Sequence, residues 1–66
     1  MTLEQLTILN TVVEEGSFRA AADKLWKTQP AVSISIAKLE EELGLQIFER
    51  GHRKTVLTDA GKRIYE

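Results

Sequence analysis

The chain has 66 residues, no cysteine and a formal net charge of −1, with 9 basic and 10 acidic side chains. At this length it forms one domain with a thin core, and the lack of cysteine excludes a disulfide framework and a thiolate metal site. No apolar run approaches the roughly 20 residues that span a bilayer, and no basic region followed by an apolar stretch opens the chain. The expected location is therefore the cytoplasm, with no membrane partner.

A first helix is predicted from residue 3 to about residue 15. Thr2 and Gln5 fit a capping box at its start, and Gly16 ends it. Its apolar residues form two stripes on different sides, Leu3, Leu6, Leu9 and Val13 on one and Ile8 and Val12 on the other. A helix with two apolar sides has two surfaces to pack against. We expect Ile8 and Val12 to cover the last helix or a second subunit, the alternative being two stray exposed side chains.

The segment from Ser17 to Ser33 is the most informative in the chain. Ser17 is a good N-cap, and apolar residues then recur at helical spacing at positions 18, 21, 22 and 25. Small residues at 20–22 let another helix cross at close range. A second helix opens at the capping residue Thr28 with Pro30 in its first turn, about two residues after the first one ends. This pattern predicts a helix-turn-helix over about 18–37, and therefore DNA binding.

The helix that opens at Thr28 is predicted to run to Leu43, with Gly44 as a left-handed stop. One side must face the core and carries Val32, Ile36, Leu39 and Leu43. The opposite side is the candidate reading surface of a recognition helix, with Pro30, Ile34, Ala37, Lys38 and Glu41, flanked by Gln29 and Ser33. The acidic run 40–42 is expected to be a solvated face, and Trp26 in the joint between the helices is expected to pack rather than contact DNA.

Two short β-prone runs, 45–50 and 55–57, enclose residues 51–54 and predict a two-stranded wing with a charged tip. Thr58 then caps a last helix over residues 59–66. Between Arg50 and Arg63 the only acidic residue is Asp59, and the basic residues are Arg50, Arg53, Lys54, Lys62 and Arg63. Phosphate binding depends on the face that charges occupy, so the near-neutral total is compatible with a basic edge.

These spaced residues together resemble the N-terminal DNA-binding domain of LysR-type bacterial transcriptional regulators. The resemblance covers essentially the whole chain and rests on Ser17-Phe18, Ala21-Ala22, Leu25, Thr28 to Ser33, Ile36, Leu39-Glu40, Leu43-Gly44, Ile47-Phe48, Arg50, Leu57-Thr58 and Ala60-Gly61. It implies a mainly α fold, a winged helix-turn-helix over 1–58 with a three-helix core, and the start of a linker helix over 59–66. It also implies a homodimer through that linker, and an effector domain, absent here, that binds a small molecule. No cofactor is expected in this domain.

The resemblance implies that Thr28, Gln29, Pro30 and Ser33 lie against the major groove of duplex DNA and its phosphates. Arg50 and Arg53 would approach the backbone or the adjacent minor groove, although a charged hairpin tip is also typical of a solvated turn. Chemically, a glutamine can pair with adenine, while its alternative is a solvated first-turn side chain. The full set of candidate DNA contacts is Lys27, Thr28, Gln29, Pro30, Ser33, Ile34, Lys38, Arg50, Arg53 and Lys54.

Ile34 departs from the family pattern, because many relatives have a basic residue there and a glutamine where this chain has Ser35. A large apolar side chain in a polar surface can pack on the C5-methyl of thymine. The alternative is a single exposed apolar residue, which is common on any protein.

A different function class is a winged helix used for protein–protein contact without DNA binding, which the net negative charge and Ile34 motivate. An enzyme is not expected. A single histidine, His52, no cysteine and the grouped carboxylates at 40–42 provide neither a nucleophile–base pair nor metal-ligand spacing.

Overall fold

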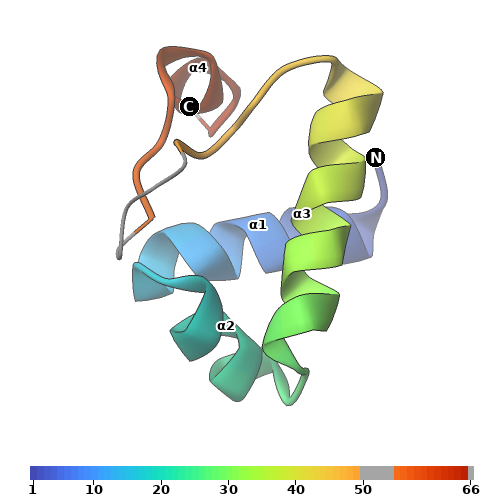
Figure 1. Ribbon diagram of the computed structural model, residues 1–66, viewed down its shortest axis with the longest axis vertical. Coiled ribbons are helices and arrows are strands. Elements are labelled where there is room, and N and C mark those ends of the chain that lie inside the picture. Colours follow the sequence, from blue (N-terminus) through green and yellow to red (C-terminus); the bar gives the residue numbers. More distant parts are fainter. Residues whose placement is uncertain (50–54, 66) are drawn as a thin grey trace.

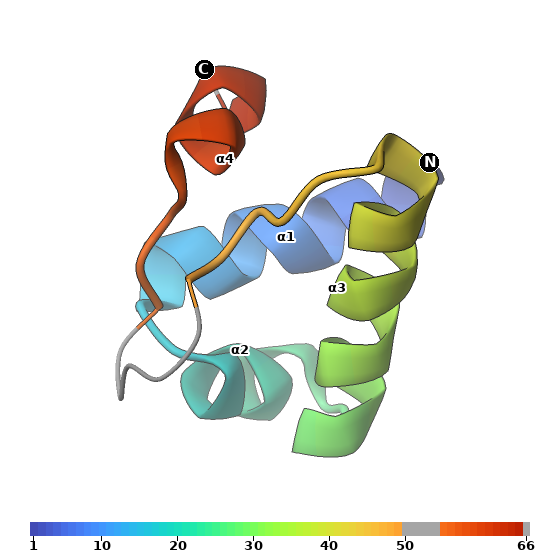
Figure 2. The same cartoon turned by 45° about the horizontal axis from the view of Figure 1, so that its top comes forward.

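The computed structural model describes residues 1–49 and 55–65, which contain four helices. They are α1 (Leu3–Glu15), α2 (Phe18–Leu25), α3 (Gln29–Leu43) and α4 (Asp59–Tyr65). The first three pack against one another, with α3 crossing α1 and α2 joined to the start of α3 by a short turn (Figure 1). On the other side of α1 from α2 lies α4 (Figures 1 and 2). The prediction of a mainly α fold is confirmed.

The helix boundaries follow from side-chain and glycine caps. The Thr2 hydroxyl accepts a hydrogen bond from the Gln5 N–H at 3.1 Å, and the Gln5 side chain accepts one from the Thr2 N–H at 2.9 Å, so the capping box is confirmed. Ser17 caps α2 by accepting from the Ala20 N–H at 3.0 Å. Gly16 and Gly44 end α1 and α3 with φ of +80° and +68°, a left-handed conformation that glycine adopts without steric cost.

The core lies between α1, α2 and α3 and includes the segment that follows α3. From α3 it takes Val32, Ile36 and Leu39, the side that the sequence predicts. Ala21 and Ala22 of α2 are also buried, and their small side chains allow the predicted close crossing. Beyond α3, Ile47 and Phe48 join the core, and the remaining members are Ile8, Leu9 and Val12 of α1.

The predicted orientation of α1 is wrong in part. Ile8 is 1% exposed and Val12 is 0% exposed, whereas Leu3 is 81% exposed and Leu6 is 43% exposed. Ile8 and Val12 therefore pack in the core with α2 and α3 and are not reserved for α4 or a second subunit. At about 100° per residue they share one face with Leu9, and this is the face that the two neighbouring helices cover.

The predicted two-stranded wing is wrong in its strands within the part of the chain that the structure describes. One isolated antiparallel bridge, Phe48–Leu57, is present there. Two backbone hydrogen bonds flank it, from the Glu49 N–H to the Val56 carbonyl at 2.7 Å and from the Thr58 N–H to the Ile47 carbonyl at 2.9 Å. The returning segment is also tied to the end of α1, because the Thr55 N–H donates to the carbonyl of the C-cap Gly16 at 3.1 Å. The predicted tip at 51–54 lies outside the described residues.

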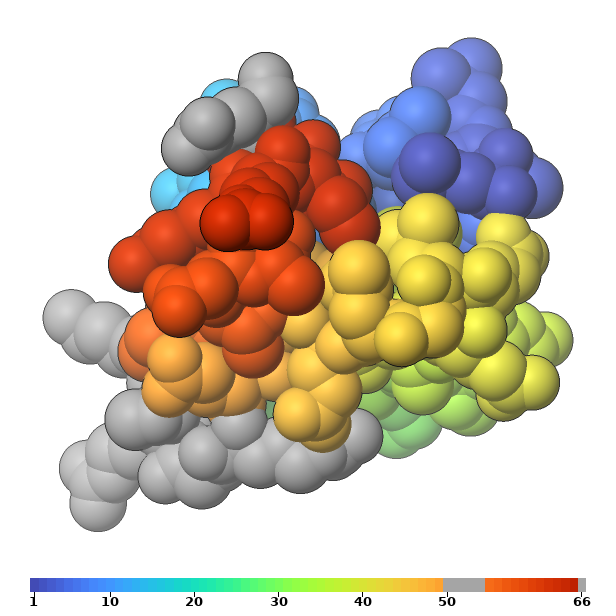
Figure 3. Space-filling model, turned by 90° about the horizontal axis from the view of Figure 1, so that it is seen from above, coloured from blue at the N-terminus to red at the C-terminus, as the bar shows by residue number. Residues whose placement is uncertain are grey.

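The segment around Ile47 runs between the end of α3 and α4 (Figure 3). On one side the Glu40 carboxylate accepts hydrogen bonds from the Ile47 N–H at 2.8 Å and the Phe48 N–H at 3.3 Å. The prediction of a solvated acidic face is therefore wrong for Glu40, which is half-buried. On the other side a Cβ on Gly61 would overlap the Ile47 carbonyl, so only glycine lets α4 approach this closely.

Two other polar contacts hold the ends of the chain. The Tyr65 hydroxyl donates to the Asn10 side chain at 2.8 Å and connects α4 to α1. The α-amino group of Met1 lies 2.7 Å from the Glu42 carboxylate, and this hydrogen-bonded charge lowers the pKa of Glu42. No helix among the described residues has the length and apolar character that crossing a membrane requires.

Candidate nucleic-acid interface

The start of α3 is built as an exposed, well-capped helix end. Thr28 has an extended backbone with φ of −84° and ψ of 155°, and its hydroxyl accepts from the Ala31 N–H at 3.2 Å. Pro30 occupies the first turn, where its missing N–H costs no intrahelical hydrogen bond. The N–H groups and the positive dipole end of a helix start attract phosphate, so this end of α3 suits an anionic ligand.

The predicted contact residues of α3 form one exposed surface, which we call the reading face and which consists of Gln29, Pro30, Ser33, Ile34 and Lys38. Four of these side chains are exposed and Ser33 is half-buried. The 55% exposure of Ile34 puts an apolar group in the middle of this face. The opposite face of α3 is fully buried at Val32 and Leu39. Because the core holds that face, the reading face has a fixed orientation.

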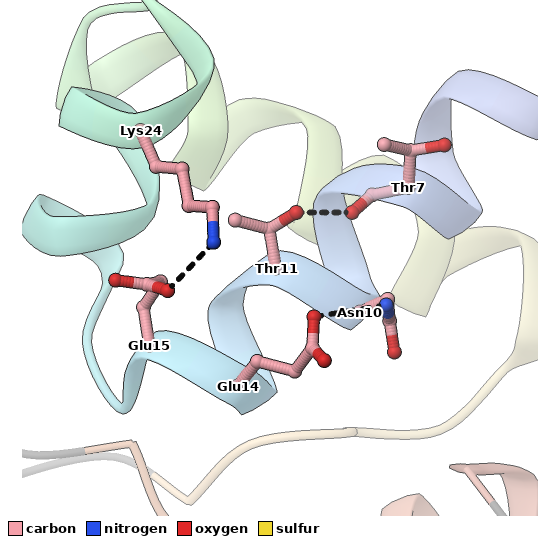
Figure 4. A network of polar contacts seen from close by, with 6 residues as sticks. All are labelled: Thr7, Asn10, Thr11, Glu14, Glu15 and Lys24. Atoms are coloured by element: carbon pink, nitrogen blue, oxygen red, sulfur yellow. Dashed lines mark hydrogen bonds and ion pairs between the residues drawn. The ribbon is translucent and has the colours of Figure 1, made fainter.

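The positive charge at the reading face comes from Lys38, which belongs to it, and from Lys27, which precedes α3. Both are exposed, and neither pairs with an acidic residue in the ranges 1–49 and 55–65. The nearby Lys24 differs, because its ammonium lies 3.3 Å from the Glu15 carboxylate across the α1–α2 turn (Figure 4). The remaining candidates, Arg50, Arg53 and Lys54, lie outside the described residues.

The predicted packing of Trp26 is wrong. Its side chain is 96% exposed, and its backbone is left-handed, with φ of 58° and ψ of 38°. Trp26 is the C-cap of α2, and its N–H donates a hydrogen bond to the Asp23 carbonyl at 3.3 Å. The N–H of the next residue, Lys27, donates to the Ala22 carbonyl at 2.9 Å. These backbone bonds make the tight joint, so the ring is not needed to fill it. The one signal in the sequence is the length of the joint, because only Trp26 and Lys27 separate the last residue of α2 from the N-cap Thr28.

No group of three or more His, Cys, Asp or Glu side chains among residues 1–49 and 55–65 is placed to hold a metal ion. The site described above is a surface defined by helix geometry, hydrogen-bonding side chains and two lysines.

The model of the bacterial regulatory helix-turn-helix proteins of the lysR family matches residues 3–62. The chain belongs to the LysR family. Its helix-turn-helix is α2 and α3, and the reading face lies on the second helix of that motif. The protein is thus a DNA-binding domain of a transcriptional regulator and not an enzyme.

Relatives and solved structures agree with this assignment. The chain is 52% identical over 63 residues to a "Probable RuBisCO transcriptional regulator" of Gracilaria tenuistipitata var. liui, which covers 96% of this chain and 20% of that protein. The BenM DNA-binding domain bound to catB site 1 DNA has a TM-score of 0.94 and 49% identity, covering 98% of this chain and 70% of that one. The CbnR DNA-binding domain in a DNA complex has a TM-score of 0.91 and 38% identity, and the match covers 97% of this chain and 74% of the CbnR chain. This LysR domain spans about a fifth of the length of the curated relatives it matches.

Proposed function

We propose that this LysR-family domain binds duplex DNA sequence-specifically by inserting α3 into the major groove. The reading face carries the proposal, because it places hydrogen-bonding and apolar side chains on the exposed side of a helix whose other side is locked in the core. A helix about 10–12 Å wide fits a major groove about 12 Å wide. The similar BenM and CbnR domains, whose structures are complexes with DNA, support this placement.

The residues at the reading face would have two roles, positioning the helix on the DNA and recognising bases. Lys27, Thr28 and the first turn of α3 would hold phosphates, as capped helix ends and lysines commonly do. Gln29 and Ile34 would contact base edges, and Ser33 and Lys38 a base or a phosphate. From the sequence, Arg50, Arg53 and Lys54 extend the contact to the backbone or the adjacent minor groove.

The whole regulator is proposed to act as a homodimer through the linker helix that α4 begins. One 66-residue module contacts too few base pairs for specificity in a genome, whereas two modules on a two-fold site double the readout. Its small-molecule effector would bind a separate domain, and its place in the cell is with the DNA, at the nucleoid.

The first test is binding to duplexes at several salt concentrations. We expect a duplex selected from a random pool with this chain to bind more tightly than a scrambled duplex of equal length. Affinity should also fall linearly on logarithmic axes as salt rises, with a slope of about −0.9 for each phosphate contacted. Fluorescence anisotropy measures both. An absence of binding to every duplex at low salt would instead favour a protein–protein interaction module.

Ile34 gives a second prediction about base readout. Ile34→Ala should weaken binding about three- to fivefold when the contacted position is thymine, since roughly one methyl contact is lost. Replacing that thymine by uracil removes only the C5-methyl. On the uracil duplex the variant and the natural chain should bind equally, as measured by anisotropy. If Ile34→Ala loses the same affinity on thymine and uracil duplexes, Ile34 does not read the methyl group.

A further inference from the structure

The turn of the helix-turn-helix carries a large side chain that the fold does not use. Trp26 is the sole tryptophan of the chain and is 96% exposed. It has a positive φ of 58°, a conformation that side chains with a Cβ adopt at a steric cost and that glycine or asparagine adopts more readily. Neither packing nor backbone geometry therefore accounts for a tryptophan at this position.

Trp26 stands beside the end of α3 that is proposed to meet DNA. It precedes the N-cap Thr28 by two positions, so the two Cα atoms lie within about 7 Å of each other. Lys27 lies between them and is exposed and unpaired among the described residues, while Asp23 is the nearest acidic residue along the chain. The turn thus leads directly into the helix that bears the reading face, and it carries an accessible lysine of its own.

We propose that Trp26 contacts the sugar–phosphate backbone at the edge of the groove that α3 enters. The inference rests on the proposed function and adds a positioning residue to it. An indole ring presents an apolar face, suited to deoxyribose, and an N–H that only donates, suited to a phosphate oxygen that only accepts. Such a contact fixes the register of α3 on the duplex and carries no base preference.

The test compares Trp26→Asn and Trp26→Phe with the natural 66-residue chain on the selected and scrambled duplexes. Asparagine accepts the left-handed conformation, so Trp26→Asn should melt at the same or a higher temperature than the natural chain. Its affinity should nevertheless fall about three- to tenfold on both duplexes, as expected for one lost hydrogen bond and its apolar contact. The affinity of Trp26→Phe, which keeps a ring but loses the N–H, should fall about half as far on a logarithmic scale.

Salt dependence separates this contact from a charge effect. Trp26→Asn should leave the salt slope unchanged, because no cation is removed, whereas the matched neighbour Lys27→Ala should reduce its magnitude by about one unit. A change in the slope of Trp26→Asn would overturn the neutral contact proposed here.

Tryptophan fluorescence gives an independent readout in the natural chain. Acrylamide should quench free Trp26 freely, and its quenching constant should fall when either duplex is bound. Unchanged quenching, or unchanged affinity of Trp26→Asn, would overturn the role of Trp26 while leaving DNA binding intact. If the natural chain binds no duplex, the proposed function fails and this inference fails with it.

Discussion

Ile8→Ala should lower the free energy of unfolding by about 2–5 kcal/mol, the cost of truncating a fully buried isoleucine. Ile8 is 1% exposed and belongs to the core cluster with residues of α2 and α3. A core of this size rarely supplies more than about 3–5 kcal/mol, so the variant should be largely unfolded. Circular dichroism during urea titration measures the loss.

Leu3→Ala is the matched control, because it makes a similar truncation on the same helix. Leu3 is 81% exposed, and its replacement should change the free energy of unfolding by no more than about 0.5 kcal/mol. Similar losses in the two variants, or a larger loss for Leu3→Ala, would mean that α1 presents the other stripe to the core.

The contrast between these residues shows why the α1 orientation could not be read from the sequence. Thr2 and Gly16 set the ends of α1 through local hydrogen bonds and backbone conformation, and both are visible in the sequence. Both of its stripes are apolar, and only the placement of α2 and α3 decides that Ile8, Leu9 and Val12 are buried while Leu3 and Leu6 stay exposed. In α3 the apolar side is single, so Val32 and Leu39 could be assigned from periodicity alone.

Contacts between distant residues account for the other differences. Glu40 looks like part of a charged run, but it accepts hydrogen bonds from N–H groups seven and eight residues later. The same contact occupies N–H groups of Ile47 and Phe48, in the segment for which the sequence predicts a strand. Strand propensity is local, whereas a ladder needs a partner in register, and one bridge is what the described residues form.

The site was predictable to the extent that it follows from helix geometry. The start of α3 and the exposure of Gln29 and Ile34 come from capping and periodicity, which are local. The outward position of Trp26, at a left-handed C-cap, could not be predicted in this way, because an aromatic ring commonly favours burial. The base preferred at each position cannot be predicted from capping, periodicity or the C-cap, since it depends on how α3 meets the groove.

Gln29→Ala should cause the largest change in base discrimination. Gln29 is exposed in the first turn of α3, immediately after the N-cap that would hold a phosphate. From there its amide can accept from N6 and donate to N7 of an adenine, a paired contact worth about 1–3 kcal/mol. The variant should therefore bind the selected duplex about 5- to 150-fold more weakly.

Duplexes with single substitutions show whether that loss is base readout. For the natural chain, changing one adenine should reduce affinity strongly, and in Gln29→Ala the same change should have almost no further effect. Gln46→Ala is the matched control, because it removes another exposed glutamine, outside the reading face, and should bind as the natural chain does. If Gln29→Ala loses affinity equally on selected and scrambled duplexes, Gln29 positions the helix through the backbone. Sequence preference would then have to come from Ile34, Ser33 and the shape of the DNA, because these are the readout routes left to this helix.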